Sequence, residues 1–147
     1  MKELNIGCVG YSSGKFNKKL GEALVGIAFK LIEEKYPSDK YTLVSGYTDM
    51  GIPAIAYRLA DKLGWETVGI ACKKAEDNPC YEVDKVIIEG SDWGDESKTF
   101  LDYIDVLIRV GGGKQSIAET NTAKECKIPV YEFDLPEFDE NDSIKKV

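Results

Sequence analysis

Short apolar runs alternate with longer amphipathic segments along most of this chain. The runs are rich in β-branched residues and apolar at nearly every position, which predicts strands buried on both faces. The longer segments place apolar residues three and four positions apart, which predicts helices. The predicted strands are Leu4–Val9, Tyr41–Ser45, Thr67–Ala71, Lys85–Glu89, Asp105–Val110 and Ile128–Glu132, and the predicted helices are Lys15–Lys35, Ile52–Leu63, Glu96–Ile104 and Gln115–Cys126.

This alternation predicts the α/β class: a Rossmann-like open parallel sheet with helices on both faces. The length of 147 residues fits a single domain. We assign residues 1–133 to that domain and residues 134–147 to an acidic C-terminal tail, which is most simply a solvated end. In such folds, ligands bind outside the carboxyl ends of the strands, where the strand order reverses.

The stretch 109–119 is the most informative part of the chain. It follows an apolar run, contains three successive glycines and leads into a helical pattern, which is the strand–turn–helix arrangement that receives phosphate. The glycines let backbone amides approach a ligand, and the dipole of the helix favours negative charge. The candidate binding residues here are Arg109, Gly111, Gly112, Gly113, Lys114, Gln115 and Ser116. Glu119 lies one helical turn further on, where it can act on what the phosphate carries.

Three other loops are expected at the same edge of the sheet. In the first, Gly10, Ser12 and Ser13 suit a phosphate or a ribose, although a plain turn into a helix explains them equally well. In the second, residues 45–53, the glycines allow close approach of a ligand, an aromatic ring can stack on a base and a carboxylate can hold a ribose. The candidates in this second loop are Gly46, Tyr47, Asp49 and Gly51.

The third of these loops, residues 90–97, places Trp93 between two glycines and several polar residues. The indole offers a stacking face for a ligand. The acidic residues Asp95 and Glu96 are open to two interpretations, since carboxylates at the start of a helix are also favoured by the helix dipole.

The composition of the chain excludes several kinds of binding site and reaction. The net charge of −7 argues against binding nucleic acid through bulk electrostatics. The absence of histidine removes the usual metal ligand and the usual general base at neutral pH. The four cysteines show no CxxC spacing, which favours buried free thiols over a disulfide or metal site. No apolar run approaches the roughly 20 residues that span a bilayer, and no signal peptide is evident. We therefore expect a cytoplasmic protein without a metal or cofactor.

On these motifs, the chain resembles the SLOG superfamily, which includes the "Lonely guy" phosphoribohydrolases and molybdenum-cofactor-carrier-like proteins. The family pattern P-G-G-x-G-T-x-x-E is similar to residues 111–119. Gly112, Gly113 and Glu119 match it, Ser116 replaces Thr, Gly111 replaces Pro, and Gln115 replaces the third Gly. Residues 45–54 and 9–13 look like the earlier family loops, so the resemblance covers residues 4–132.

The resemblance implies a nucleotide site, a homodimer and a role for Glu119 at an N-glycosidic bond. In the phosphoribohydrolases an Arg precedes the fifth strand, and its position here is held by Glu96. The pair Glu96 and Glu119 is more like the carboxylates of nucleoside deoxyribosyltransferases, where they would stabilise an oxocarbenium-like transition state.

Three functional hypotheses follow. The first is a protein that binds a phosphorylated nucleoside, such as a nucleoside monophosphate or ADP-ribose, without turning it over. The second is an N-glycosidase, either a hydrolase or a transferase, that uses Glu119 and Glu96. The third is an interaction module whose acidic tail carries the function.

Overall fold

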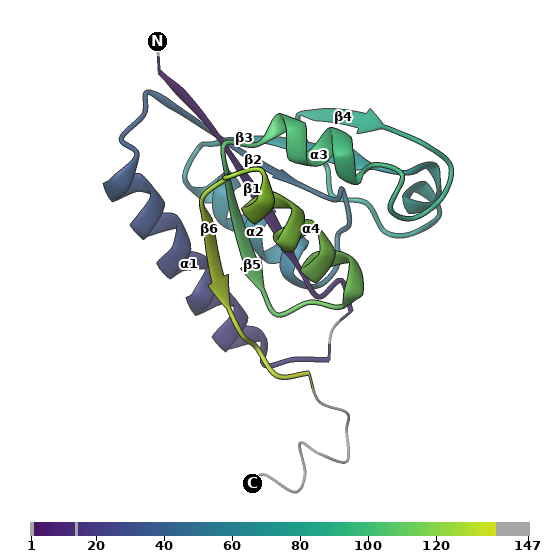
Figure 1. Ribbon diagram of the computed structural model, residues 1–147. Helices are drawn as coiled ribbons and strands as arrows, with labels where there is room; N and C mark the ends of the chain where they lie inside the picture. Colours follow the sequence, from purple (N-terminus) through teal and green to yellow (C-terminus); the bar gives the residue numbers. More distant parts are fainter. Residues whose placement is uncertain (1, 14, 138–147) are drawn as a thin grey trace, which may run out of the picture.

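The computed structural model describes residues 2–13 and 15–137. Six parallel strands form one sheet in the order β4-β3-β2-β1-β5-β6 (Figure 1). The strands are β1 (Glu3–Gly10), β2 (Lys40–Ser45), β3 (Glu66–Ala71), β4 (Lys85–Ile88), β5 (Val106–Val110) and β6 (Val130–Phe133). The helices are α1 (Lys18–Lys35), α2 (Gly51–Lys62), α3 (Ser97–Tyr103) and α4 (Lys114–Glu125), with a short 3-10 helix η1 (Lys73–Asp77). The predicted α/β class and single Rossmann-like domain are confirmed.

The two faces of the sheet are covered by different helices. Because successive side chains of a strand point to opposite faces, β5 sends Val106, Ile108 and Val110 into a core shared with α1 and α2. Its residue Leu107 joins a second core, together with side chains of α3 and α4. The strand order reverses between β1 and β5, so the ligand edge predicted for this fold lies at the carboxyl ends of these strands.

Helix α1 begins three residues later than its hydrophobic pattern predicts. Asn17 is the N-cap, and its side-chain oxygen accepts a hydrogen bond from the backbone N–H of Leu20 at 3.0 Å. The core face of this helix includes Phe29, whose ring stacks on Trp65 with 4.6 Å between centroids. The capping interaction therefore fixes the start of α1.

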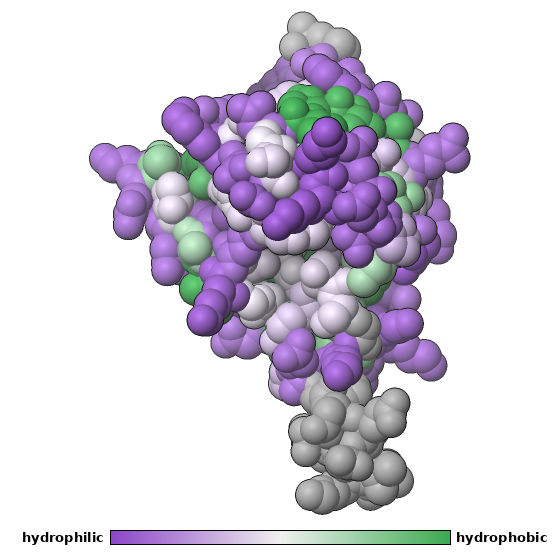
Figure 2. All heavy atoms as spheres, turned by 90° about the vertical axis from the view of Figure 1, so that its right-hand side faces the viewer, coloured by the Kyte–Doolittle hydropathy of each residue, from purple (hydrophilic) through white to green (hydrophobic). Residues whose placement is uncertain are grey.

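Strand β4 differs from the prediction that strands are buried on both faces. It lies at the edge of the sheet and exposes Val86 and Ile88. Figure 2 views the right-hand side of Figure 1, the side on which β4 lies, and shows hydrophobic surface near its top among strongly hydrophilic groups. An apolar run therefore identifies a strand without distinguishing a central from an edge position.

The remaining sequence expectations have mixed outcomes. Cys8 and Cys72 are buried, but Cys126 is exposed, because it lies at the C-terminal end of α4, where the chain is open to solvent. Helix η1 was not predicted. Residues 138–147 of the predicted acidic tail lie outside the described residues. No helix in the described ranges has the length and apolar character needed to span a membrane.

Candidate functional site

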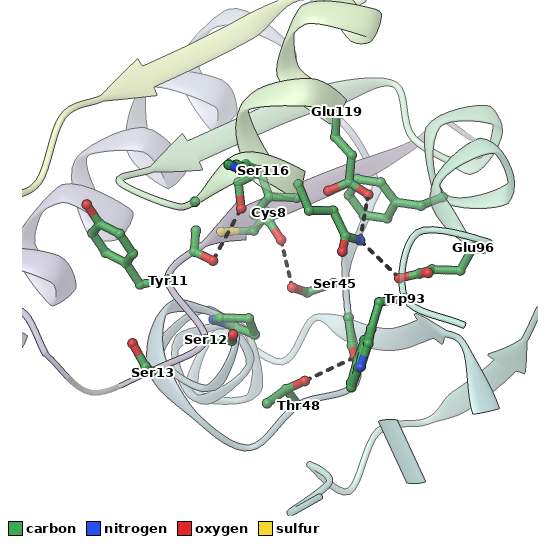
Figure 3. Close-up of a pocket in the computed structure, with 18 of the residues that line it drawn as sticks. Cys8, Tyr11, Ser12, Ser13, Ser45, Thr48, Trp93, Glu96, Ser116 and Glu119 are labelled. Atoms are coloured by element: carbon green, nitrogen blue, oxygen red, sulfur yellow. Dashed lines mark hydrogen bonds between the residues drawn. The ribbon is translucent and has the colours of Figure 1, made fainter. Parts of the chain in front are cut away.

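A cleft of about 390 Å³ opens at the carboxyl ends of β1 and β2 (Figure 3). All four strand-end loops contribute to it. Its lining residues are Cys8, Val9, Gly10, Tyr11, Ser12, Ser13, Ser45, Gly46, Thr48, Pro53, Ile70, Trp93, Glu96, Phe100, Gly113, Lys114, Gln115, Ser116, Glu119 and Glu137. The cleft size falls in the range of small-molecule sites.

The N-terminus of α4 forms one wall of the cleft. The N-cap is Gly113, so no side chain caps the helix at this position. The carbonyl of Gly113 accepts the first helical hydrogen bond, from the N–H of Ile117 at 3.1 Å. The preceding N–H groups of residues 114–116 have no partner within the helix. These donors, the helix dipole and the ammonium of Lys114 make this wall favourable for an anion.

The three glycines before α4 have different roles. Gly111 and Gly112 adopt φ values of 61° and 110°, in the region that favours glycine. A Cβ on Gly111 would lie 2.4 Å from the ring of Tyr11, and one on Gly112 would lie 2.6 Å from the Cβ of Ser116. A Cβ on Gly113 would have no neighbour within 4 Å among the residues that the structure describes. The first two glycines thus form the bend, and Gly113 alone of the three lines the cleft.

Hydrogen bonds join the bottom of the cleft to the sheet. The hydroxyl of Ser45 donates to the carbonyl of Cys8 at 2.6 Å, and the hydroxyl of Ser116 donates to the carbonyl of Gly10 at 3.4 Å. Ser12 and Ser13 are exposed, and in Figure 3 they lie across the cleft from the start of α4. These contacts fix the end of β1 beside the first turn of α4, and the hydroxyls of Ser12 and Ser13 lie on the facing wall.

Two buried carboxylates, Glu96 and Glu119, form an acidic end of the cleft (Figure 3). The side-chain nitrogen of Gln115 lies 3.2 Å from Oε2 of Glu96 and 3.5 Å from Oε2 of Glu119. The hydroxyl of Ser97 donates to Oε2 of Glu119 at 2.7 Å, and the N–H of Gly94 donates to Oε1 of Glu96 at 2.8 Å. Ser97 is a contact that the sequence pattern alone did not identify.

The pKa of Glu119 is raised above its ordinary value. The largest cause is burial, which disfavours the charged form. Hydrogen bonds from Ser97 and Gln115 oppose the rise, and the nearby charge of Glu96 adds to it. A carboxyl with a raised pKa in a cleft is suited to proton transfer or to hydrogen bonding in either protonation state.

The loop after β2 presents Thr48, rather than its two neighbours, to the cleft. Thr48 forms an isolated antiparallel bridge with Cys80. Tyr47 has a left-handed φ of 70°, and its side chain packs over Gly69. Asp49 lies 4.0 Å from Arg58 in an ion pair.

Two further sequence candidates, Gly51 and Arg109, do not line the cleft. Gly51 contacts the first loop, where a Cβ would lie 2.1 Å from the carbonyl oxygen of Tyr11. Arg109 points toward the edge strand β6, where its guanidinium lies 3.3 Å from Glu132 and 3.0 Å from Asp134. The same guanidinium donates to the carbonyl of Gly111 at 2.8 Å, so it braces the bend from behind.

Trp93 lines the cleft and is half exposed, with 53% of the residue's surface open to solvent. In Figure 3 its ring lies between Thr48 and Glu96. A flat ring in this position can stack on an aromatic group of a ligand. Within residues 2–13 and 15–137, no group of three or more His, Cys, Asp or Glu residues is arranged to hold a metal ion.

No family model and no curated protein matches this chain. Solved structures do match it. The Moco carrier protein from Chlamydomonas reinhardtii is 22% identical, with a TM-score of 0.69 over 90% of this chain and 76% of that one. The molybdenum cofactor binding protein from the phototrophic bacterium Rippkaea orientalis is 21% identical, with a TM-score of 0.66 over 99% of this chain and 81% of that one. The fold implied by the SLOG resemblance is therefore confirmed.

Proposed function

We propose that the cleft binds a small phosphorylated ligand of the nucleotide class, with its phosphate at the N-terminus of α4. One observation carries this proposal above the others. The uncapped start of a 12-residue helix lines a cleft at the point where the strand order reverses. Helix dipole, free N–H groups and fold topology all favour an anion at that place.

The donors available to the phosphate come from two walls. The first turn of α4 offers backbone N–H groups and the ammonium of Lys114, and the opposite loop offers the hydroxyls of Ser12 and Ser13. The side of Gly113 that faces the cleft is open, so the anion can approach the helix closely. Together these groups would neutralise a phosphate in a protein whose overall charge is −7.

The acidic end of the cleft determines which groups the ligand can carry beyond its phosphate. An ionised carboxylate only accepts hydrogen bonds, so the amide of Gln115 must present its nitrogen to Glu96 and Glu119. The remaining group of that amide is a carbonyl, which also accepts. This wall therefore favours a ligand that carries donors, such as the hydroxyls of a ribose or the N–H groups of a base, with an aromatic ring against Trp93.

The two solved structures of the same fold are proteins that carry or bind the molybdenum cofactor. This cofactor accordingly belongs in a ligand panel beside the nucleotides. Calorimetric titration with AMP, GMP, ADP-ribose, inorganic phosphate and the molybdenum cofactor tests the proposal. We expect a nucleotide to bind with micromolar affinity and inorganic phosphate to bind more weakly. Failure of every compound in the panel to bind would refute the proposal.

A second candidate is an N-glycosidase that uses Glu119. Its support is the position of this carboxyl, which is buried in the cleft beside Glu96 and has a raised pKa. Such a residue could protonate a departing base or stabilise positive charge on the sugar. Incubation with nucleoside monophosphates, NAD and ADP-ribose, followed by chromatography for free base, tests this activity. Base release that is lost in Glu119→Gln supports the enzyme, whereas binding without release leaves the first function.

A further inference from the structure

Tyr57 on α2 places its hydroxyl group under the loop that follows β2. The side chain is buried and does not line the cleft. Its hydroxyl donates to the carbonyl of Val68 on β3 and accepts from the backbone N–H of Tyr47, both at 3.0 Å. Burial raises the pKa of this hydroxyl, so the group stays protonated and keeps its donor role. A single side chain thus ties the loop after β2 to the sheet.

The backbone of Tyr47 has a conformation that side chains disfavour. Its φ of 70° lies in the left-handed region, which residues other than glycine rarely adopt. Such a conformation persists only where the surroundings hold it. The carbonyl of Tyr47 accepts from the N–H of Tyr81 at 2.9 Å, and its own N–H donates to the Tyr57 hydroxyl. The hydroxyl is therefore a contact of this residue that one substitution can remove.

The conformation of Tyr47 sets the direction of the next residue, Thr48, which lines the cleft. The hydroxyl of Thr48 donates to the carbonyl of Gly46 at 3.4 Å, a long hydrogen bond that a ligand can replace. In Figure 3 Thr48 lies on the same side of the cleft as Trp93 and apart from Ser116 in the first turn of α4. Thr48 therefore faces the part of the cleft that would take a nucleoside rather than its phosphate.

We propose that Tyr57 is a positioning residue: its hydroxyl holds Tyr47 in the left-handed conformation, so that the Thr48 hydroxyl meets the nucleoside part of a bound nucleotide. This inference rests on the function proposed for the cleft, and it assigns part of ligand recognition to a residue that the ligand does not touch. Without the hydroxyl, the N–H of Tyr47 loses its acceptor and the backbone can relax to a negative φ. Thr48 then leaves its place, and the nucleoside loses a hydrogen bond.

Calorimetric titration of Tyr57→Phe measures the effect on binding, with whichever of AMP, GMP and ADP-ribose binds wild type most tightly. We expect the Kd to rise about threefold to tenfold. Tyr81→Phe is the matched control and should bind as wild type does, because its ring stacks on Tyr57 at 4.9 Å between centroids but its hydroxyl contacts Asp61. Equal affinities of Tyr57→Phe and wild type would overturn this inference alone, whereas a wild type that binds none of the nucleotides would overturn the proposed function with it.

A crystal structure of Tyr57→Phe gives a readout that needs no ligand. We expect the φ of Tyr47 to leave the left-handed region and Thr48 to leave its place in the cleft. The Tyr81→Phe variant should keep both. An unchanged loop in Tyr57→Phe would show that the hydroxyl does not hold it, which would overturn the inference.

A double-mutant cycle separates positioning of Thr48 from a general loosening of the fold. Thr48→Val removes the hydroxyl that Tyr57 is proposed to place, so adding Tyr57→Phe to it should raise the Kd by less than about twofold. Lys114→Ala removes a group of the phosphate wall instead, and in that background Tyr57→Phe should weaken binding as much as it does in wild type. The same effect of Tyr57→Phe in both backgrounds would show that it does not act through Thr48 and would overturn the inference.

Discussion

The side-chain nitrogen of Gln115 donates to the carboxylate of Glu96 at 3.2 Å, and this contact joins the loop before α3 to the first turn of α4. The other oxygen of Glu96 accepts from the N–H of Gly94. Both oxygens are thus engaged within the protein. Glu119, by contrast, receives its hydrogen bonds from Ser97 and Gln115 on one oxygen, Oε2. We infer that Glu96 positions the acidic end and that Glu119 is the carboxylate that meets a ligand.

The positioning role of Glu96 predicts the result of Glu96→Ala. Stability should fall by about 1 kcal/mol, since two donors lose their acceptor. AMP affinity should also fall, because Gln115 is no longer held. Asp95→Ala is the matched control: the Asp95 carboxylate accepts from the N–H groups of Ser91 and Asp92 in the same loop, but it does not line the cleft. Urea unfolding and calorimetry of both variants measure the two effects, and equal losses of affinity would contradict this role.

The raised pKa of Glu119 predicts a pH-dependent difference in stability. A carboxyl whose folded pKa lies above its unfolded pKa contributes stability below the unfolded value, and this contribution is lost as pH rises through the folded value. Glu119→Gln removes the cost of a buried negative charge and keeps an oxygen for Ser97. Its melting temperature should therefore exceed that of wild type at pH 8, by a margin that shrinks toward pH 4. A margin independent of pH would contradict the assigned cause.

Alanine at Gly111 and alanine at Gly113 should lower the stability of the protein by different amounts. Gly111→Ala places a side chain on a residue with a φ of 61° and against the ring of Tyr11. We expect the free energy of unfolding to fall by about 1–3 kcal/mol. The new Cβ of Gly113→Ala would face open space, on a residue with a φ of −97°. The free energy of unfolding should therefore change by less than about 1 kcal/mol. Urea unfolding measures both. Similar losses of stability at the two positions would show that the bend also requires glycine at position 113.

Much of the fold follows from local pattern, because each buried strand is apolar along its length and each helix repeats its apolar positions. The convergence of the four loops follows as well, since parallel strands end at one edge. Local signals do not reveal which side chains of a loop enter the cleft. Thr48 rather than Tyr47 enters it because of a pairing with Cys80, which is distant in the sequence. Arg109 turns away because Glu132 and Asp134 lie on the neighbouring strand and its extension.

Calorimetric titration of AMP into Gly113→Asp tests the central claim most directly. The new carboxylate would cap α4 and place negative charge where the phosphate is proposed to bind. We expect unchanged stability within about 0.5 kcal/mol and at least about tenfold weaker binding than wild type. Asn17→Asp is the control, because it adds the same charge at the N-cap of α1, outside the cleft, and should bind AMP as wild type does. If Gly113→Asp bound AMP as tightly as wild type, the phosphate would not lie at the start of α4.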